Sequence, residues 1–182
     1  MTKIEAFTYG AQKDALAVMK SSANHLISCG QTLWNPDHLT LNLFKGLANP
    51  EIIVGYANSM PIAAMLLTSI DEEFWPEVKL GESRFIHKLA VTPTHKGQGI
   101  GHQMLVKAVH EARAGQAAYL RLDCAGDRPR LGHFYESFGF SKVKEGMVGP
   151  YFSAFYELKL ANQSVDPELR MIPAGVPNGS NE

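Results

Sequence analysis

A short apolar strand that leads into a glycine-rich turn and then a helix is the feature that most constrains the fold of this chain. The apolar stretch 85–91 ends before Pro93, and Gly97, Gly99 and Gly101 follow at every second position. Because glycine has no side chain, a ligand can approach the main chain of such a turn closely. Unpaired amide N–H groups and the positive end of the helix dipole attract anions there. The turn is therefore predicted to bind a ligand that carries phosphate.

The segment after the turn has the pattern of an amphipathic helix. Apolar residues recur every three or four positions from Ile100 to Ala112, and Gly115 ends the segment. A tight loop that needs glycine only for its own geometry has the same appearance in isolation. The elements around the turn must therefore decide between the two interpretations.

Composition narrows the class of protein. The chain has 182 residues, a formal net charge of −1, 45% hydrophobic residues and 19% charged residues. These values are typical of one globular domain, and the lack of a basic excess argues against nucleic acid as a partner. No apolar run is long enough for a membrane span, and the N-terminus lacks the apolar core of a signal peptide. We expect a cytoplasmic protein that binds neither nucleic acid nor membrane.

The two cysteines, Cys29 and Cys124, are far apart and lack the spacing of a zinc site. Buried free thiols are the expected state of both, and no metal site is predicted.

The first part of the chain predicts two helices and three strands. A strand is expected over 2–8, a helix over 14–28, and a hairpin from the apolar runs 52–56 and 62–67. Asn35 as N-cap and Pro36 at the first helical position predict a second helix that runs to Leu47.

The second part predicts a strand over 119–124, a short helix capped by Asp127, and two closing strands that end near 160. From 163 to 182 the sequence is polar and without period, which is typical of a flexible tail. The expected fold class is α+β, with a single domain over residues 1–162.

Three sequence blocks in a fixed order carry a family resemblance. They are Leu89-Ala90-Val91 with the turn 96–101, then Leu122-Asp123-Cys124, then the aromatic segment 131–140. Together they resemble the GNAT superfamily of acetyl-CoA-dependent N-acetyltransferases, over about residues 3 to 160. The resemblance implies a mixed, mostly antiparallel sheet of six or seven strands, flanked by about four helices, with a splayed pair of central strands.

The resemblance also implies acetyl-CoA as cofactor, held by backbone groups of the strand and the turn. Two positions depart from the family pattern: Lys96 replaces arginine or glutamine, and Arg128 replaces asparagine. Arg128 either reaches the adenine-ribose phosphate or is solvated. The expected cofactor-binding residues are Leu89, Ala90, Val91, Lys96, Gly97, Gln98, Gly99, Ile100, Gly101, His102 and Arg128.

Two catalytic residues are expected. Tyr135 matches the family tyrosine that protonates the departing CoA thiolate. His87 is the first candidate for the base, because it lies two residues before Leu89, on the same strand face in a regular strand, and can titrate near neutrality. The alternatives are water and three acidic residues of one loop, Glu72, Glu73 and Glu77.

The predicted activity is transfer of an acetyl group to a primary amine of a small molecule or peptide, by direct attack on the thioester and without an acyl-Cys124. The alternative is a non-catalytic acetyl-CoA-binding sensor or partner-binding module. A P-loop is disfavoured because its Gly-Lys-Ser/Thr ending is missing. The sequence leaves open a homodimer and the identity of the acceptor.

Overall fold

The structure is a computed structural model that describes residues 2–160. The predicted tail, 163–182, and the end of the predicted domain lie outside the described residues.

One seven-stranded sheet forms the centre of the protein, in the order β1-β2-β3-β4-β5-β7-β6. Among the described strands, β4 and β5 pair in parallel, and every other neighbouring pair is antiparallel. The strands are β1 (Ala6–Tyr9), β2 (Glu51–Ala57), β3 (Met60–Thr68), β4 (Ser83–Val91), β5 (Tyr119–Ala125), β6 (Ser141–Val148) and β7 (Tyr151–Lys159). The mixed, mostly antiparallel α+β sheet predicted from the sequence is confirmed.

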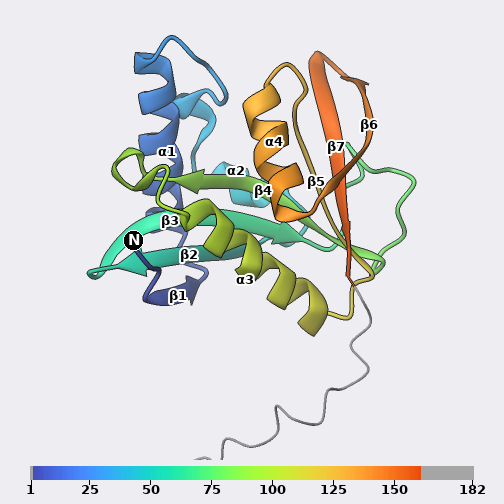
Figure 1. Ribbon diagram of the computed structural model, residues 1–182, viewed down its shortest axis with the longest axis horizontal. Helices are drawn as coiled ribbons and strands as arrows, with labels where there is room; N and C mark the ends of the chain where they lie inside the picture. Colours follow the sequence, from blue (N-terminus) through green and yellow to red (C-terminus); the bar gives the residue numbers. More distant parts are fainter. Residues whose placement is uncertain (1, 161–182) are drawn as a thin grey trace, which may run out of the picture.

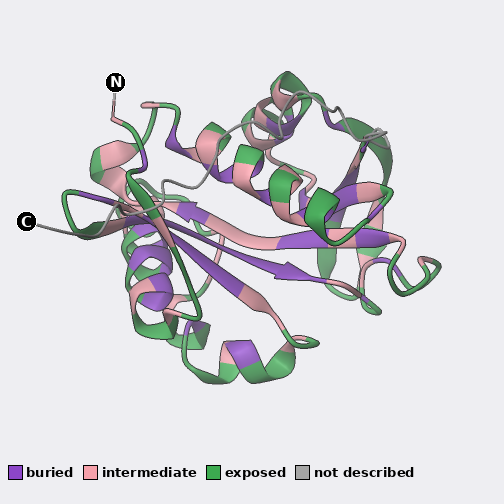
Figure 2. Ribbon diagram, turned by 90° about the horizontal axis from the view of Figure 1, so that it is seen from below, coloured by how far each residue is buried: buried purple, intermediate pink, exposed green. Residues whose placement is uncertain are grey.

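Helices cover both faces of this sheet (Figure 1). They are α1 (Gln12–Ser28), α2 (Asn42–Gly46), α3 (Ile100–Ala114) and α4 (Pro129–Phe138), with short 3-10 helices η1 (Pro36–His38) and η2 (Pro93–His95). Alternating strand residues divide the core into two layers: Ile52 and Val54 pack with α1 and α2, while Ile53 packs with α3 and α4. Figure 2 shows the buried strands between helices whose outer surfaces are exposed.

The hairpin of β2 and β3 follows the sequence prediction. Its two turn residues, Asn58 and Ser59, both have positive φ, at 49° and 60°. A two-residue turn of this kind matches the twist of the strands it joins.

The prediction of one continuous helix from Asn35 to Leu47 is wrong, because the structure has two short helices, η1 and α2, in its place. The Asn35 side chain does cap η1, accepting a hydrogen bond from the Asp37 N–H at 2.9 Å. The backbone then leaves the helical region at Leu39, with ψ of 73°, before α2 begins. Leu39 and Phe44 are buried in the same core layer, and the break in the helix lets both side chains reach it.

The predicted cap of α4 is also wrong. Arg128 occupies the N-cap position, and its side chain makes no capping hydrogen bond. Asp127 lies one residue too early, because an N-cap side chain must reach the N–H groups two or three positions ahead. Gly139 ends the helix with φ of 116°, as the sequence predicted.

No helix in the described part of the chain is long and apolar enough to cross a membrane.

Candidate active site

A groove of about 1060 Å³ lies between the end of β4, the glycine turn, the start of α4 and the segment after α1. It is lined by every residue predicted to bind the cofactor except Gln98, and by Tyr135. Residues separated by more than a hundred positions, such as Trp34 and Tyr135, share its walls. The predicted phosphate-binding turn and the predicted proton donor therefore belong to one cavity.

The glycine turn presents main-chain donors to this groove. Gly97 and Gly99 have φ of 75° and 78°, in the left-handed region that favours glycine. The Gln103 N–H donates to the Gly99 carbonyl at 3.1 Å, the first bond of the α3 ladder. The N–H groups of Ile100 and Gly101 precede this donor and have no partner within the helix. The turn and the helix end thus have the backbone geometry that suits an anion, and binding of the cofactor phosphates there stays a prediction.

Gly101 is required for packing and not for its backbone angle, which any residue could adopt. A β-carbon at this position would lie 3.0 Å from Cζ of Phe134 on α4. Glycine here lets α4 approach the first turn of α3, which sets the width of the groove.

Two predicted cofactor residues have partners inside the protein. The Gln98 side chain donates to the Thr94 carbonyl at 2.9 Å and contacts the Thr2 hydroxyl, and it does not line the groove. The Arg128 guanidinium donates to the Thr32 carbonyl at 2.5 Å. Arg128 thereby connects the start of α4 to the segment after α1, on the opposite wall of the groove.

A bulge in β4 corrects one expectation about His87. Lys88 has φ of 53°, and the register with β3 shifts between Ala64 and Leu66. His87 pairs with Leu66, which belongs to the α1 layer, whereas Leu89 packs into the α3 layer. The prediction that His87 and Leu89 share a face is wrong, because one extra residue reverses the alternation.

The central strands separate just beyond this point. The parallel ladder of β4 and β5 ends at the pair Ile86 and Leu122. His87 and Asp123 are the next residues on the two strands, at the fork where β4 and β5 diverge. The predicted splayed pair of strands is therefore present, and both residues lie at its apex.

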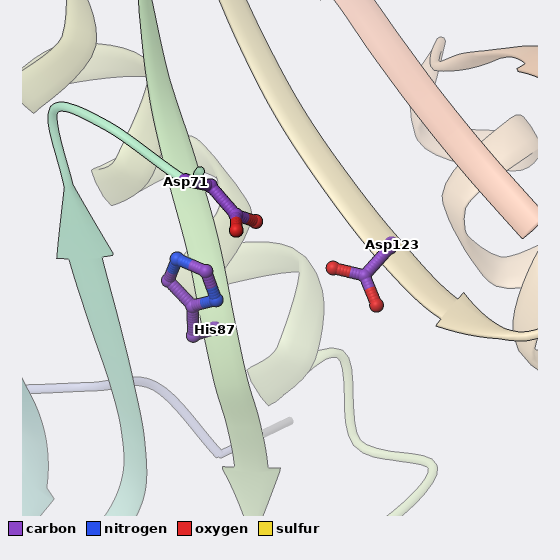
Figure 3. A group of neighbouring side chains, drawn as sticks. All are labelled: Asp71, His87 and Asp123. Carbon is purple, nitrogen blue, oxygen red and sulfur yellow. The ribbon is translucent and has the colours of Figure 1, made fainter. Parts of the chain in front are cut away.

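A third polar residue joins them. Asp71, in the loop after β3, is 9% exposed, and its carboxylate faces His87 and Asp123 (Figure 3). One ligand atom from each of the three side chains lies within 4.8 Å of the other two. Asp71 Oδ1 accepts a hydrogen bond from the Phe74 N–H at 3.1 Å, while the buried Oδ2 has no partner among the described residues.

The hydrogen bonds of Thr68 assign the tautomer of His87. The Thr68 hydroxyl donates its single proton to the Ile70 carbonyl at 2.8 Å and lies 3.0 Å from His87 Nε2. His87 Nε2 must then carry a hydrogen and donate to Thr68, which leaves Nδ1 as an acceptor in the neutral ring. Figure 3 shows the second ring nitrogen directed toward Asp123.

Burial changes the ionisation of this cluster. Desolvation, with the charge of Lys88, lowers the pKa of His87 to about 4. Desolvation, with the charge of Asp71, raises the pKa of Asp123 to about 7, although Lys88 opposes the shift. At neutral pH His87 is therefore an uncharged, weakly basic ring, and Asp123 is the group that titrates.

Tyr135 lies in the core layer of α3 and α4, on the other face of the sheet from Leu66, the partner of His87. It is 6% exposed and packs against Phe134, Phe140 and Tyr156. Burial raises its pKa, and the charges of Cys124 and Asp123 add to the shift. The phenol is therefore protonated at neutral pH and lies within electrostatic range of Asp123.

Asp71 and Asp123 are functional candidates that sequence reasoning missed. A signal existed for Asp123: it alternates with Leu122 and Cys124, so it faces away from their core layer in the middle of a buried strand. Asp71 gave no such signal, because its loop position is fixed only by tertiary packing. Asp, His and Asp are residue types that can hold a metal ion, so the absence of a metal site stays a prediction.

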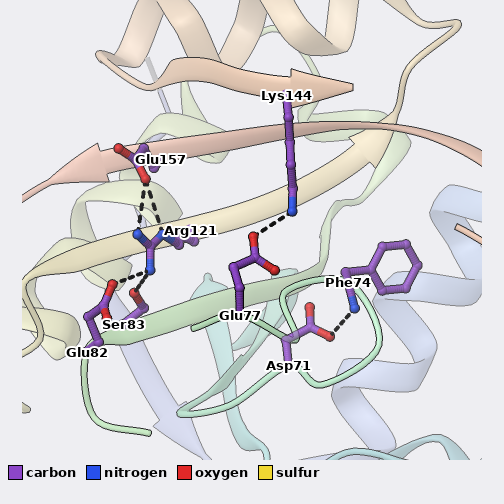
Figure 4. Close-up of polar contacts among 8 residues, drawn as sticks. All are labelled: Asp71, Phe74, Glu77, Glu82, Ser83, Arg121, Lys144 and Glu157. Carbon is purple, nitrogen blue, oxygen red and sulfur yellow. Dashed lines mark hydrogen bonds and ion pairs between the residues drawn. The ribbon is translucent and has the colours of Figure 1, made fainter. Parts of the chain in front are cut away.

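The neighbouring loop is held by aromatic and ionic contacts. Trp75 is buried at 3% exposure against Phe85 and Phe155, so it is a packing residue. Glu77 pairs with Lys144, and the Phe74 N–H bonds Asp71 (Figure 4). These contacts fix the loop that carries Asp71.

Cys124 is buried and Cys29 is exposed, which corrects the expectation that both thiols are buried. Desolvation raises the pKa of the Cys124 thiol to about 12. A thiol of this kind is a poor nucleophile at neutral pH.

Comparison with known proteins agrees with this geometry. Residues 20–140 match the model of the acetyltransferase (GNAT) family. An uncharacterized N-acetyltransferase from Bacillus subtilis, YesJ, is 33% identical over 70 residues. That match covers 38% of this chain and 39% of YesJ, so it spans well under half of either protein.

Solved structures share the fold. An acetyltransferase of the GNAT family from Listeria monocytogenes superposes with a TM-score of 0.67 at 20% identity, covering 85% of this chain and 94% of its own. The yncA protein of Salmonella typhimurium, described as a putative acetyltransferase with its cofactor acetyl-CoA, gives a TM-score of 0.61 at 16% identity. It covers 88% of this chain and 96% of its own. With the family model matched over most of the described domain, the chain belongs to the GNAT family of acetyltransferases.

Proposed function

We propose that this chain transfers an acetyl group from acetyl-CoA to a primary amine of a small molecule or peptide. The observation that supports this most strongly is the groove itself, in which an anion-binding glycine turn, an open strand edge and a buried phenol converge. A structural relative, yncA, is described with acetyl-CoA as its cofactor.

The main chain of β4 provides the site for the pantetheine arm. Beyond Ile86 the strand still pairs with β3 on one side but no longer with β5 on the other. The backbone groups of Leu89 and Val91 on the open side can therefore pair with an extended amide chain, as an added strand would. The diphosphate then falls at the Gly97–Gly101 turn, and the thioester at the fork.

Transfer proceeds by direct attack of the amine on the thioester carbonyl carbon. The C–N bond forms and the C–S bond breaks, and the leaving thiolate takes a proton from Tyr135. Cys124 does not form an acyl intermediate, because its pKa of about 12 keeps the thiol protonated.

Ligand binding and thiol release test this proposal separately. Acetyl-CoA should raise the melting temperature by several degrees at saturating concentration, whereas ATP and NAD at equal concentration should not. An amine panel should then release free CoA thiol. Stabilisation by acetyl-CoA with no release from any amine would favour the non-catalytic sensor, and stabilisation by ATP or NAD alone would contradict the proposal.

A further inference from the structure

The Asp71, His87 and Asp123 cluster has the character of a cation site at the fork, where His87 lies two residues before Leu89, a residue that lines the groove. Two carboxylates converge there, and the buried Asp71 Oδ2 has no hydrogen-bond partner among residues 2–160. An unpaired buried acceptor is costly, so a donor that fills the site recovers free energy. His87 Nδ1 adds a neutral acceptor to the two acids.

We infer that this cluster binds the acceptor as an alkylammonium cation, and that Asp123 takes its proton before attack; the inference rests on the proposed acetyltransferase function. A primary ammonium group has three N–H donors, and the cluster offers three acceptors. Three hydrogen bonds of about 2.8 Å from one nitrogen place their acceptors about 4.6 Å apart. The three ligand atoms lie within 4.8 Å of one another, and the spacing that an ammonium requires falls inside this limit.

A divalent metal ion fits less well. Tetrahedral bonds of about 2.0 Å would require the three atoms to lie about 3.3 Å apart. The ammonium of Lys88, which lies over the Trp34 ring at 5.3 Å, interacts electrostatically with Asp123 and repels a doubly charged ion more strongly than a singly charged one. The site therefore favours a singly charged cation.

The fork brings this cation to the thioester. His87 and Asp123 are the first residues beyond the end of the β4–β5 ladder, and Tyr135 on α4 lines the groove together with Leu89. The charge of Asp123 contributes to the raised pKa of Tyr135, which places the two groups within electrostatic range. We expect a nitrogen held by the cluster to lie close to a carbonyl carbon held near Tyr135.

Each proton lost by the ammonium has an acceptor in this reaction. The ammonium gives one proton to the Asp123 carboxylate, and the nitrogen lone pair then attacks the carbonyl carbon. The second proton leaves the nitrogen when the tetrahedral intermediate collapses, and it offsets, through solvent, the proton that Tyr135 gives to the thiolate. Asp123 releases its proton to solvent before the next turnover.

Several charged groups face Asp123 and set its titration. Asp71 and Glu73 of the loop raise its pKa, and Lys88 of β4 lowers it. His87 of β4 is uncharged near neutrality, and so are Cys124 of β5 and Tyr135 of α4. The pH dependence of amine transfer is therefore expected to follow Asp123.

Three six-membered-ring amines of similar size test the acceptor class. Cyclohexylamine is a cation at neutral pH, aniline is uncharged, and 1-aminocyclohexanecarboxylic acid adds a carboxylate beside the nitrogen. Cyclohexylamine should give the highest kcat/KM, by 10-fold or more. Equal or faster transfer to aniline or to the amino acid would overturn the inference while leaving the acetyltransferase proposal intact.

Isosteric variants test the residues. Asp71→Asn should raise the KM for cyclohexylamine about 10-fold with a smaller change in kcat. Asp123→Asn should lower kcat about 100-fold. Both should bind acetyl-CoA like the wild type, which shows that the groove is folded. Asp37→Asn, an exposed carboxylate on η1, is the matched control and should leave the kinetics unchanged.

The pH profile separates Asp123 from His87 as the base. In the wild type, kcat/KM should rise with pH through about 7, the pKa of Asp123, and this limb should disappear in Asp123→Asn. A limb near pH 4 that persists in Asp123→Asn would assign the base to His87 and contradict the inference.

Direct binding gives a readout that needs no turnover. Calorimetric titration of cyclohexylamine into the CoA-saturated protein should show binding in the wild type and in Asp37→Asn, and little in Asp71→Asn. No binding in the wild type, equal binding in all three proteins, or Asp71-dependent binding of Zn²⁺ in place of the amine would overturn the inference. Absence of any acetyl-CoA binding would instead remove the proposed function.

Discussion

Burial determines what each polar residue at the fork can do. Tyr135 is enclosed by aromatic rings and stays protonated, so it can donate a proton but cannot act as a base. His87 is neutral, with a pKa of about 4, while Asp123 titrates near 7. Groups whose surroundings separate their pKa values in this way suit opposite proton-transfer roles.

Tyr135→Phe isolates the role of one hydroxyl. The ring contacts with Phe134 and Phe140 remain, so stability should change by less than about 1 kcal/mol. Thiol release at saturating acetyl-CoA should fall about 100-fold, the range of a lost general acid. Tyr151→Phe, at an exposed tyrosine, is the control. An unchanged rate in Tyr135→Phe would remove Tyr135 from the mechanism.

At the scale of elements, the fork depends on a fixed end of the β4–β5 ladder. Arg121 on β5 is 8% exposed and donates to Ser83 of β4 at 2.7 Å. It also bonds Glu82, in the loop, and Glu157, on β7 (Figure 4). One guanidinium thus joins three segments at the paired end of the strands, while the other end stays open for a ligand.

Arg121→Met should weaken this paired end. It removes the hydrogen bonds and the stacking of the guanidinium on Trp75 and Tyr119. We expect a loss of about 2–4 kcal/mol in the free energy of unfolding, measured from urea midpoints. Arg113→Met, an exposed arginine in the last turn of α3, should cost less than about 1 kcal/mol. Equal costs for the two variants would show that the network contributes little.

At the scale of the whole molecule, the candidate site lies between two well-packed core layers, and its buried carboxylates lower the free energy of unfolding. When burial raises the pKa of a carboxyl group, its charged form has a higher free energy in the folded protein than in the unfolded chain. Asp123 meets this condition, and Asp71 is shifted in the same direction by desolvation. Unfavourable burial of acids is expected where function requires it.

Asp123→Asn should therefore stabilise the protein at high pH. The folded-state pKa of about 7 exceeds the unfolded value, so the penalty is full above pH 7 and fades as pH falls toward 4. We expect a gain on the order of 2 kcal/mol at pH 8 and less than half of that gain at pH 5, from urea unfolding at both values. Asp37→Asn should show no such pH dependence. A gain that grows toward low pH would have the wrong sign.

The sequence by itself determined the local elements and the position of the glycine turn. The periods of apolar residues located α1, α3 and the strands, and glycine spacing located the turn, because these signals depend on neighbours along the chain. Order and spacing of the blocks around Tyr135 were enough to indicate the family. Pairing of the hairpin and the cap at Asn35 followed from turn and capping chemistry in the same way.

Only the tertiary structure decided which residues meet at the reacting end. The bulge at Lys88 moved His87 to the other face from Leu89, and nothing in the local period of β4 indicates an extra residue. Asp71 and Asp123 come together because a loop held by Trp75 folds over the point where two strands separate. Such contacts depend on long-range packing and strand register, which the spacing of residues in the sequence does not encode.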